Sequence, residues 1–418
     1  MTARESRGFA LILTLSLLAL LVLAVYGLGV LTRVGSQTAI SSSRQETARQ
    51  NALLGLEQAV GALQQWAGRD DCATAMAGIA GEPAGSQRRH WCGVWASSGA
   101  FLGWLTSGAT TSATPSLGSF PIVQLIAQKS VGNTSSADNE FVDAGKIPLM
   151  ISDASGVSIK LGSYAYWVGD EGVKMSAWVP NGSLPQPGLL IGAPSTPANI
   201  NRMVGAFQLF DTTNAAKVIA YAQATNLAYA AGKKLTASNL QDSFHHVTLT
   251  HWKVAPDGSR LLAGAINMNT TSNVVWRSIL ESYETVGATH FGTSTKRTSA
   301  INAIANGIAA TSSGKFANGP FPNVDAFLGS ALLSSAVTGA TGISVADFSA
   351  VMRPMLVSRS DTFRVRAYGE ALNPLDASKI EATAFCEAIV QRTLASAADG
   401  RGRKFVVTYF RWLSGNDI

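Results

Sequence analysis

The sequence predicts an α+β protein: a long N-terminal membrane helix continues into an amphipathic helix, which packs on an antiparallel β-sheet with helical insertions. Three observations predict this architecture. Residues 9–31 are apolar without a charge, residues 37–66 have helical apolar spacing without proline, and residues 357–418 read as strands between turns. A long N-terminal helix together with an antiparallel sheet that helical insertions interrupt is an α+β architecture.

The composition excludes several classes of function. Among 418 residues, 32 Lys and Arg face 26 Asp and Glu, giving a net charge of +6, and charged residues make up only 14%. A nucleic-acid surface needs clustered basic side chains, so this mild excess predicts no nucleic-acid partner. The low charged fraction also argues against a cytosolic surface, where charged side chains maintain solubility. Ser, Thr, Asn and Gln supply the polarity instead.

Residues 9–31 are predicted to be a transmembrane helix. As a helix, this stretch spans about 34 Å, enough to cross a bilayer core of about 30 Å. A cleaved secretory signal has an apolar stretch of only about 7–15 residues, followed by a site with small side chains. This stretch is longer and lacks such a site, which favours a retained single-pass anchor.

The expected orientation of the anchor follows from the sizes of the two flanking segments and not from their charges. Arg4 and Arg7 precede the span, whereas Arg33, Arg44 and Arg49 follow it, so the positive-inside rule does not decide. The short N-terminal segment is expected to stay in the cytoplasm. The large remainder, rich in Ser and Thr and poor in charge, is expected outside it, in the periplasm or at the cell surface.

Residues 32–68 are predicted to extend the membrane helix as an amphipathic helix. Apolar side chains recur there at intervals of four, three, four and three, at Ala52, Leu56, Ala59, Leu63 and Trp66. This spacing places them on one helical face, which we expect to pack on the globular part. An ordinary helix that follows an anchor would show the same stripe.

Residues 69–198 are predicted to form a Gly/Ser-rich region, irregular with short helical pieces over 69–120, and a β-hairpin over 157–179. Cys72 and Cys92 are candidates for a disulfide, which would contribute about 3 kcal/mol in an oxidising compartment. The alternative is two buried free thiols. Asp170 and Glu171 occupy the predicted hairpin turn, where turn formation is the favoured role over acid–base catalysis.

The rest of the chain divides into two parts. Residues 199–356 are predicted to be a mixed, mainly helical insertion with a β-hairpin at 244–267, whose turn is Pro256-Asp257-Gly258. Residues 357–418 are predicted to be antiparallel strands, at 362–366, 380–392 and 404–413. Cys386 shares an apolar strand face with Ala384, Ala388 and Val390, so it is expected to be a small buried side chain.

No catalytic residue is predicted. Ser312-Ser313-Gly314-Lys315 fits a phosphate loop at neither end and lacks the partner motifs of a Ser-x-x-Lys enzyme. His245, His246 and His251 cannot share one metal ion from a single strand, because alternate residues point to opposite faces.

No confident metal site is predicted, and the only cofactor considered is Ca²⁺. Asp138, Glu140 and Asp143 are hard oxygen ligands of the type that Ca²⁺ prefers. The alternative is a solvated loop, since no twelve-residue EF-hand pattern is present.

The junction Arg7-Gly8-Phe9-Ala10-Leu11-Ile12 resembles a type IV prepilin. That resemblance implies a leader at 1–8, cut after Gly8 by a prepilin peptidase on the cytoplasmic face of the inner membrane, and methylation of Phe9. Leu13 stands at the fifth position after the cut, where pilins usually have Glu. Minor tip subunits, such as K-type pseudopilins and X-type minor pilins, commonly lack that Glu, which implies a minor or tip subunit.

Two further sets of segments carry a resemblance. Residues 167–174 and 266–271 are similar to the Asp-Glu turn and the Ile-Asn-x-Asn-Thr stretch of K-type pseudopilins, a class that binds Ca²⁺ at positions that do not map onto this sequence. Residues 363–370, 384–392 and 409–413 look like the Verru_Chthon cassette protein A family of pilin-like proteins. These resemblances imply a helical domain inserted into a pilin-like sheet.

The sequence therefore predicts a pilin-like or pseudopilin-like structural component of an envelope fibre or secretion-type assembly. Its expected partners are the inner membrane, a prepilin peptidase and other pilin-like subunits. Two alternatives stay open at this point. One is a permanently anchored extracytoplasmic hydrolase, and the other is a static adhesive or binding module.

Overall fold

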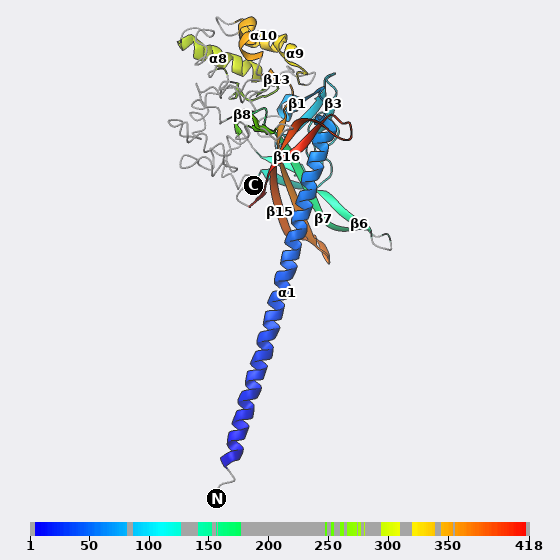
Figure 1. The fold of residues 1–418 in the computed structure, drawn as a ribbon, viewed down its shortest axis with the longest axis vertical. Helices are drawn as coiled ribbons and strands as arrows, with labels where there is room; N and C mark the ends of the chain where they lie inside the picture. Colours follow the sequence, from blue (N-terminus) through cyan, green and yellow to red (C-terminus); the bar gives the residue numbers. More distant parts are fainter. Residues whose placement is uncertain are drawn as a thin grey trace.

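The computed structural model describes most of the chain outside the central insertion. The described residues are 5–81, 87–126, 141–152, 156, 158–176, 247–248, 252–254, 260–262, 266–273, 275–276, 280, 294–309, 320–338, 344–353 and 356–414. They confirm the predicted α+β architecture, in which a long N-terminal helix packs on an antiparallel sheet (Figure 1).

Helix α1 (Glu5–Ala67) is one uninterrupted helix of 63 residues. Figure 1 shows its N-terminal part projecting away from the globular part, while its C-terminal part lies along the sheet. The apolar side chains from Leu11 to Leu31 are exposed. The two predicted helical segments, 9–31 and 32–68, are therefore parts of one rod.

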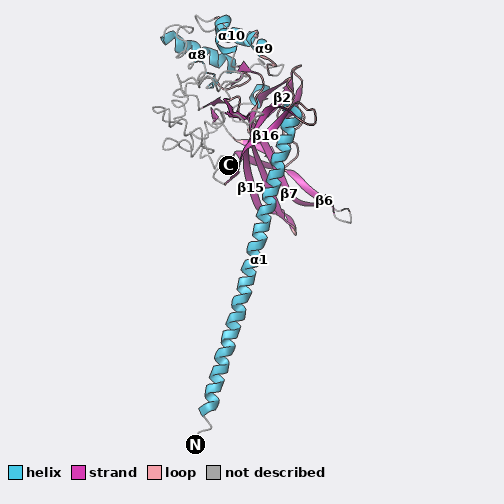
Figure 2. Cartoon of the chain, in the orientation of Figure 1, coloured by secondary structure: helices cyan, strands magenta, loops and turns pink. Residues whose placement is uncertain are grey.

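The main sheet has five antiparallel strands in the order β16-β15-β14-β7-β6. The strands are β6 (Ile147–Ser152), β7 (Ser158–Asp170), β14 (Thr362–Asn373), β15 (Asp376–Ser396) and β16 (Arg403–Leu413). The last three contain the predicted C-terminal strands, and β14 and β15 run well beyond the predicted bounds. Helix α1 packs on one face of this sheet, which leaves the other face for the remaining elements (Figure 2).

Residues 72–76, 92–96 and 101–104 form strands in the region where irregular structure with short helical pieces was predicted. Strands β1 (Cys72–Met76), β2 (Cys92–Ala96) and β3 (Phe101–Trp104) form a three-stranded antiparallel sheet, with the 3₁₀ helix η1 (Ala77–Ala80) after β1. The prediction failed because Gly, Ser and Ala are weak strand formers. Packing stabilises this sheet instead, through edge-to-face contacts of Trp104 with Trp91 and Trp95. Strands β4 (Ile122–Ile126) and β5 (Val142–Gly145) form a separate antiparallel pair.

The hairpin predicted over 157–179 is wrong. Strand β7 ends at Asp170 and pairs with β6 and β14. The following strand, β8 (Met175–Ser176), pairs in parallel with β9 (Val247–Thr248). Two strands joined by a short turn usually pair, but near Asp170 one edge of β7 is occupied by β14 and the other by residues 105–107.

The two ends of the helical part of the insertion, residues 266–357, lie side by side in the structure. Strand β12 (Ile266–Asn267) pairs in parallel with β13 (Leu356–Val357). Between them lie the helices α8 (Ser294–Ala309), α9 (Val324–Leu328), α10 (Ala331–Thr338) and α11 (Val345–Met352). The hairpin predicted at 244–267 is present as β10 (Trp252–Val254) and β11 (Arg260–Leu262). The predicted helix over 199–232 lies outside the described residues.

Candidate functional site

The C-terminal half of α1 is packed tightly on the sheet. Of the predicted stripe, Ala52, Ala59 and Leu63 are fully buried, Leu56 is 6% exposed, and Trp66 is partly buried. The opposite surface is the apolar face of β14 and β15, where most side chains are small: Phe363, Val365, Ala367, Ala371, Ala384, Cys386, Ala388 and Val390. The predicted face of Cys386 is thus the one that contacts α1.

A close contact at a glycine and two side-chain hydrogen bonds fix the position of α1 on the sheet. A Cβ added at Gly369 would collide with the backbone of Ala48 and Ala52, so the helix backbone lies directly on the strand. Asn51 Nδ2 donates to the backbone oxygen of Glu370 at 2.8 Å, and Gln64 Nε2 donates to that of Arg403 at 2.9 Å. The helix is held at both ends of the contact.

The N-terminal half of α1 is exposed and apolar. In the described part of the chain, α1 is the one helix long and apolar enough to cross a membrane, and none of its most apolar stretch is buried. The hydroxyls of Thr14 and Ser16 donate to backbone oxygens one turn earlier, at 2.9 Å each, so they do not need water. Gly8 and Phe9 lie in the first turns of this helix.

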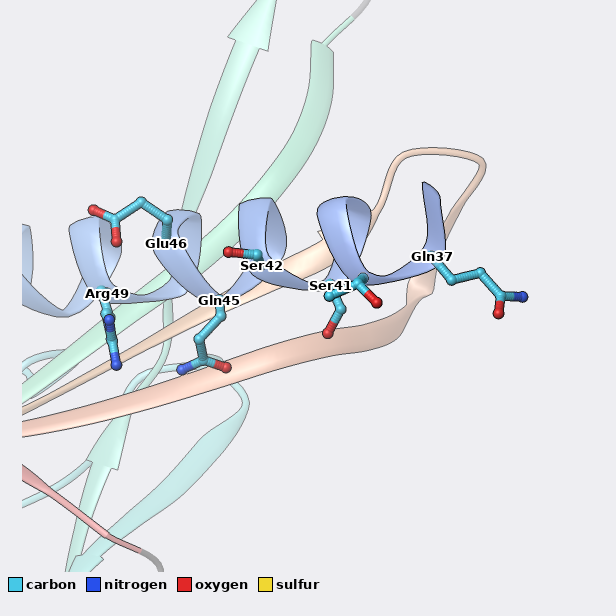
Figure 3. Close-up of a pocket in the computed structure, with 7 residues that line it drawn as sticks. Gln37, Ser41, Ser42, Gln45, Glu46 and Arg49 are labelled. Atoms are coloured by element: carbon cyan, nitrogen blue, oxygen red, sulfur yellow. The ribbon is translucent and has the colours of Figure 1, made fainter. Parts of the chain in front are cut away.

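A polar groove of about 630 Å³ runs along α1 where the helix leaves the sheet (Figure 3). Its lining side chains carry hydroxyls, amides and one opposite pair of charges, and they are Gln37, Thr38, Ser41, Ser42, Gln45, Glu46 and Arg49. These residues include no histidine, cysteine or lysine that would activate a serine hydroxyl. The groove therefore offers a polar contact surface.

The other face of the sheet carries a buried group of charged side chains, here called the charge cluster: Glu171, Lys174, Arg364, Arg366, Glu387 and Arg411. Arg364 joins the two carboxylates, with its Nε 3.0 Å from Glu171 Oε1 and its Nη1 2.9 Å from Glu387 Oε1. Glu387 also accepts from Arg366 Nε at 2.9 Å and Arg411 Nε at 3.0 Å. The Lys174 ammonium lies 2.6 Å from Glu171.

Burial alone would favour neutral carboxyl groups, but the cations of the charge cluster outweigh it. Desolvation opposes ionisation of Glu171, yet the charges of Arg364 and Lys174 lower its pKa to about 2. The pKa of Glu387 is likewise held well below its usual value by Arg364, Arg366 and Arg411. Burial lowers the pKa of Lys174 despite its pairing with Glu171. Both carboxylates are therefore ionised at neutral pH.

Asp170 lies beside the charge cluster in a separate buried polar network. Its Oδ2 accepts from Thr74 Oγ1 at 3.0 Å and its Oδ1 from the backbone of Gly172 at 2.8 Å. Asn267 Nδ2 in turn donates to Thr74 Oγ1 at 2.9 Å, and to Ser360 Oγ at 3.1 Å. Burial raises the pKa of Asp170 to about 6. This network connects β1, β7, β12 and the segment before β14.

The sequence patterns did not reveal the charge cluster, and they predicted a hairpin turn at Asp170 and Glu171. Both residues are instead buried. A signal was present in the C-terminal strands: charges at alternate positions, Arg364 and Arg366, with Glu387 and Arg411 on the strands that follow. Such alternation puts the charges on one face, and their opposite signs are those of cross-strand pairs. The cluster is fully ion-paired, which suits a structural role.

The predicted disulfide between Cys72 and Cys92 is not formed, and both cysteines are buried free thiols. The register explains this: Cys72 pairs with Ala96 and Cys92 pairs with Met76, at opposite ends of the β1–β2 ladder. At 3.3 Å per residue, about 13 Å of strand separates them, beyond the reach of a bridge.

One of the three Ca²⁺ candidates can be placed. Asp143 in β5 is buried, burial raises the pKa of its carboxyl group, and its Oδ1 accepts no hydrogen bond from the described residues. Asp138 and Glu140 lie outside the described residues, as do the Ser312–Lys315 motif and the three histidines. Within the described ranges, no group of three or more His, Cys, Asp or Glu side chains is placed to hold a metal ion.

Comparison with known proteins finds likeness among solved structures. No protein-family model matches the chain, and no curated protein matches it. Among solved structures, a chain of the GspK–GspI–GspJ complex of the type 2 secretion system of enterotoxigenic Escherichia coli matches with a TM-score of 0.32 and 12% identity. The match covers 64% of this chain and 84% of that one.

Proposed function

We propose that this protein is a pilin-like structural subunit of an envelope fibre or secretion-type assembly, in a minor or tip position. It is inserted into the inner membrane as a prepilin and cut after Gly8 by a prepilin peptidase. Methylation of the new N-terminal residue, Phe9, follows. Its partners are other pilin-like subunits, and its globular part lies in the periplasm or at the cell surface.

The observation that carries this proposal is the division of α1 into two halves of opposite character. From Leu11 to Leu31 the apolar side chains are exposed, whereas from Ala48 to Ala67 one face is locked onto the sheet. A permanent anchor needs a membrane span but no rigid connection to the folded part. One unbroken helix of 63 residues instead transmits the position of the membrane segment to the globular part, as a subunit of a helical assembly requires.

Leu13 is consistent with a tip position. Its side chain is 55% exposed on α1, in the place where a pilin resemblance leads one to expect a carboxylate. A buried carboxylate in a membrane or a helix bundle is costly unless it meets a cation. A subunit at the end of a fibre lacks one neighbour, so an apolar residue at this position avoids an unpaired charge.

Site-specific photo-crosslinking in the native host tests the proposal. A photoreactive residue at Leu21, exposed in the apolar half of α1, is expected to crosslink to other pilin-like subunits. The same residue at Ala398, exposed in the turn between β15 and β16, is the control and is expected to give few such crosslinks. Crosslinks from Leu21 to lipid alone, with the peptidase and the other subunits present, would contradict a role in assembly.

A further inference from the structure

The hairpin formed by β14 and β15 projects along α1 toward the N-terminal, apolar half of the helix (Figures 1 and 3). Its turn consists of Pro374 and Leu375, between Asn373 and Asp376. Strand β7 pairs with β14 as far as Ala371, opposite Gly162, and past that point β14 pairs with β15, Leu372 with Ile380 and Asn373 with Asp376. The turn is thus directed at the membrane that α1 would cross.

The position of the turn along α1 follows from contacts between α1 and β15, which run in the same direction. Arg44 Nε lies 2.9 Å from Glu381 Oε2, and further along, Arg392 Nη2 donates to the backbone oxygen of Gly68 at 2.7 Å. From Glu381 back to Asp376 the strand covers about 16 Å, which equals about eleven residues of helix. The turn therefore reaches the level of about Arg33, just past the end of the apolar span at Leu31.

The turn exposes an apolar side chain, Leu375, where a soluble protein would usually have a polar residue. Leu375 is 96% exposed, and the nearby Ile380 is 47% exposed. Turns at this kind of position usually carry Gly, Asn, Asp or Ser. The surroundings suit the boundary between lipid headgroups and acyl chains, because Lys379 and Arg33 place two cations near an apolar tip, with Asp376 offsetting one of them.

We propose that the β14–β15 turn is a second membrane contact, in which Leu375 enters the headgroup–acyl boundary of the outer leaflet of the membrane that α1 spans. This inference rests on the proposed membrane insertion of α1. The two contacts together fix the rotation of the globular part about the helix axis. Withdrawal of α1 from the membrane during assembly would release the turn.

Depth measurement by fluorescence quenching tests the contact. The full chain is reconstituted in vesicles of phosphatidylcholine and phosphatidylglycerol, with a cysteine-reactive fluorophore at L375C. The three native cysteines are buried, so the introduced thiol is the one labelled in the folded protein. The matched control is A398C, an exposed turn residue at the opposite end of β15. A third variant, L21C, reports insertion of α1.

Lipids with a spin label at the headgroup, high on the acyl chain or deep on the acyl chain act as quenchers. The proposal predicts quenching at L375C several-fold stronger than at A398C, and strong quenching at L21C by deeper labels. Quenching at L21C with equal, weak quenching at L375C and A398C would overturn the second contact while α1 remains a membrane helix. Absence of quenching at L21C as well would overturn both the contact and the proposed insertion.

Discussion

Gly369 of β14 lies against Ala52 of α1 with no room for a side chain between the two backbones. The helix and the strand therefore lie backbone against backbone, near the N-terminal end of the packed half of α1. The rigid connection between the membrane segment and the globular part depends on this contact.

Replacing Gly369 with alanine tests the contact. The added methyl group collides with the backbone of Ala48 and Ala52, so G369A is expected to lower the free energy of unfolding by at least about 1–3 kcal/mol. The control is G61A on the exposed side of α1, where no atom lies within 4 Å of the added Cβ. That variant is expected to gain up to about 1 kcal/mol from helix propensity. Equal stability of the two variants in denaturant titrations would show that α1 is not packed as described.

The charge cluster predicts that the free energy of unfolding depends strongly on Glu387. The variant E387Q leaves Arg364, Arg366 and Arg411 without their shared carboxylate, and loss of one partner from a buried ion pair costs about 3–5 kcal/mol. The matched control on the same strand is E381Q, whose ion pair with Arg44 is partly exposed and contributes about 0–1 kcal/mol. Chemical denaturation of both variants compares the two sites. A loss at E387Q no larger than at E381Q would contradict the buried ionic network.

The buried carboxyl of Asp170 predicts a pH dependence of stability. Its folded pKa of about 6 lies above the ordinary value of 3.8, so between these values the folded protein holds a proton that the unfolded chain has released. The stabilisation is fully present below about pH 4 and is lost as pH rises through about 6. A shift of about two units corresponds to about 3 kcal/mol.

The variant D170N isolates this effect, because asparagine mimics the neutral acid. Between pH 3.5 and 7.5 the wild-type protein is expected to lose about 3 kcal/mol relative to D170N. Glu171 and Glu387 contribute the opposite slope at lower pH, but they do so equally in both proteins. A difference between wild type and D170N that does not change with pH would contradict the raised pKa.

The thiols give a prediction that needs no substitution. Cys72, Cys92 and Cys386 are buried and free, and burial raises the pKa of each thiol, so all three are expected to resist alkylation in the folded protein. After unfolding without a reductant, mass spectrometry should find three alkylated cysteines. Alkylation of Cys386 alone would show that Cys72 and Cys92 form a disulfide, which would contradict the structure.

Local patterns in the sequence predicted the helix but not the partners of the strands. The spacing from Ala52 to Leu63 is a property of neighbouring turns, so it predicts both α1 and its packed face. Near Asp170 the partners of β7 come from residues 105–107 and 363–367, and no local pattern around Asp170 contains that information. A turn-like Gly-Asp-Glu-Gly sequence therefore suggested a hairpin that distant strands prevent.

The charge cluster was missed for the same reason. Glu171, Arg364 and Glu387 are far apart in sequence, and each taken alone is typical of a solvated strand or turn. Only the register of β14 with β7 and β15 brings their side chains to one buried face. The small residues of β1 and β2 show a related limit, since their strands depend on aromatic packing and not on local propensity.

The proposed function requires that α1 begins as a prepilin helix, which is cut after Gly8. Intact-mass measurement of the membrane-extracted protein, from cells that contain a prepilin peptidase, tests it most directly. The account predicts loss of the mass of residues 1–8 together with the gain of one methyl group on Phe9. A chain that retains its leader in the presence of an active peptidase would contradict the account.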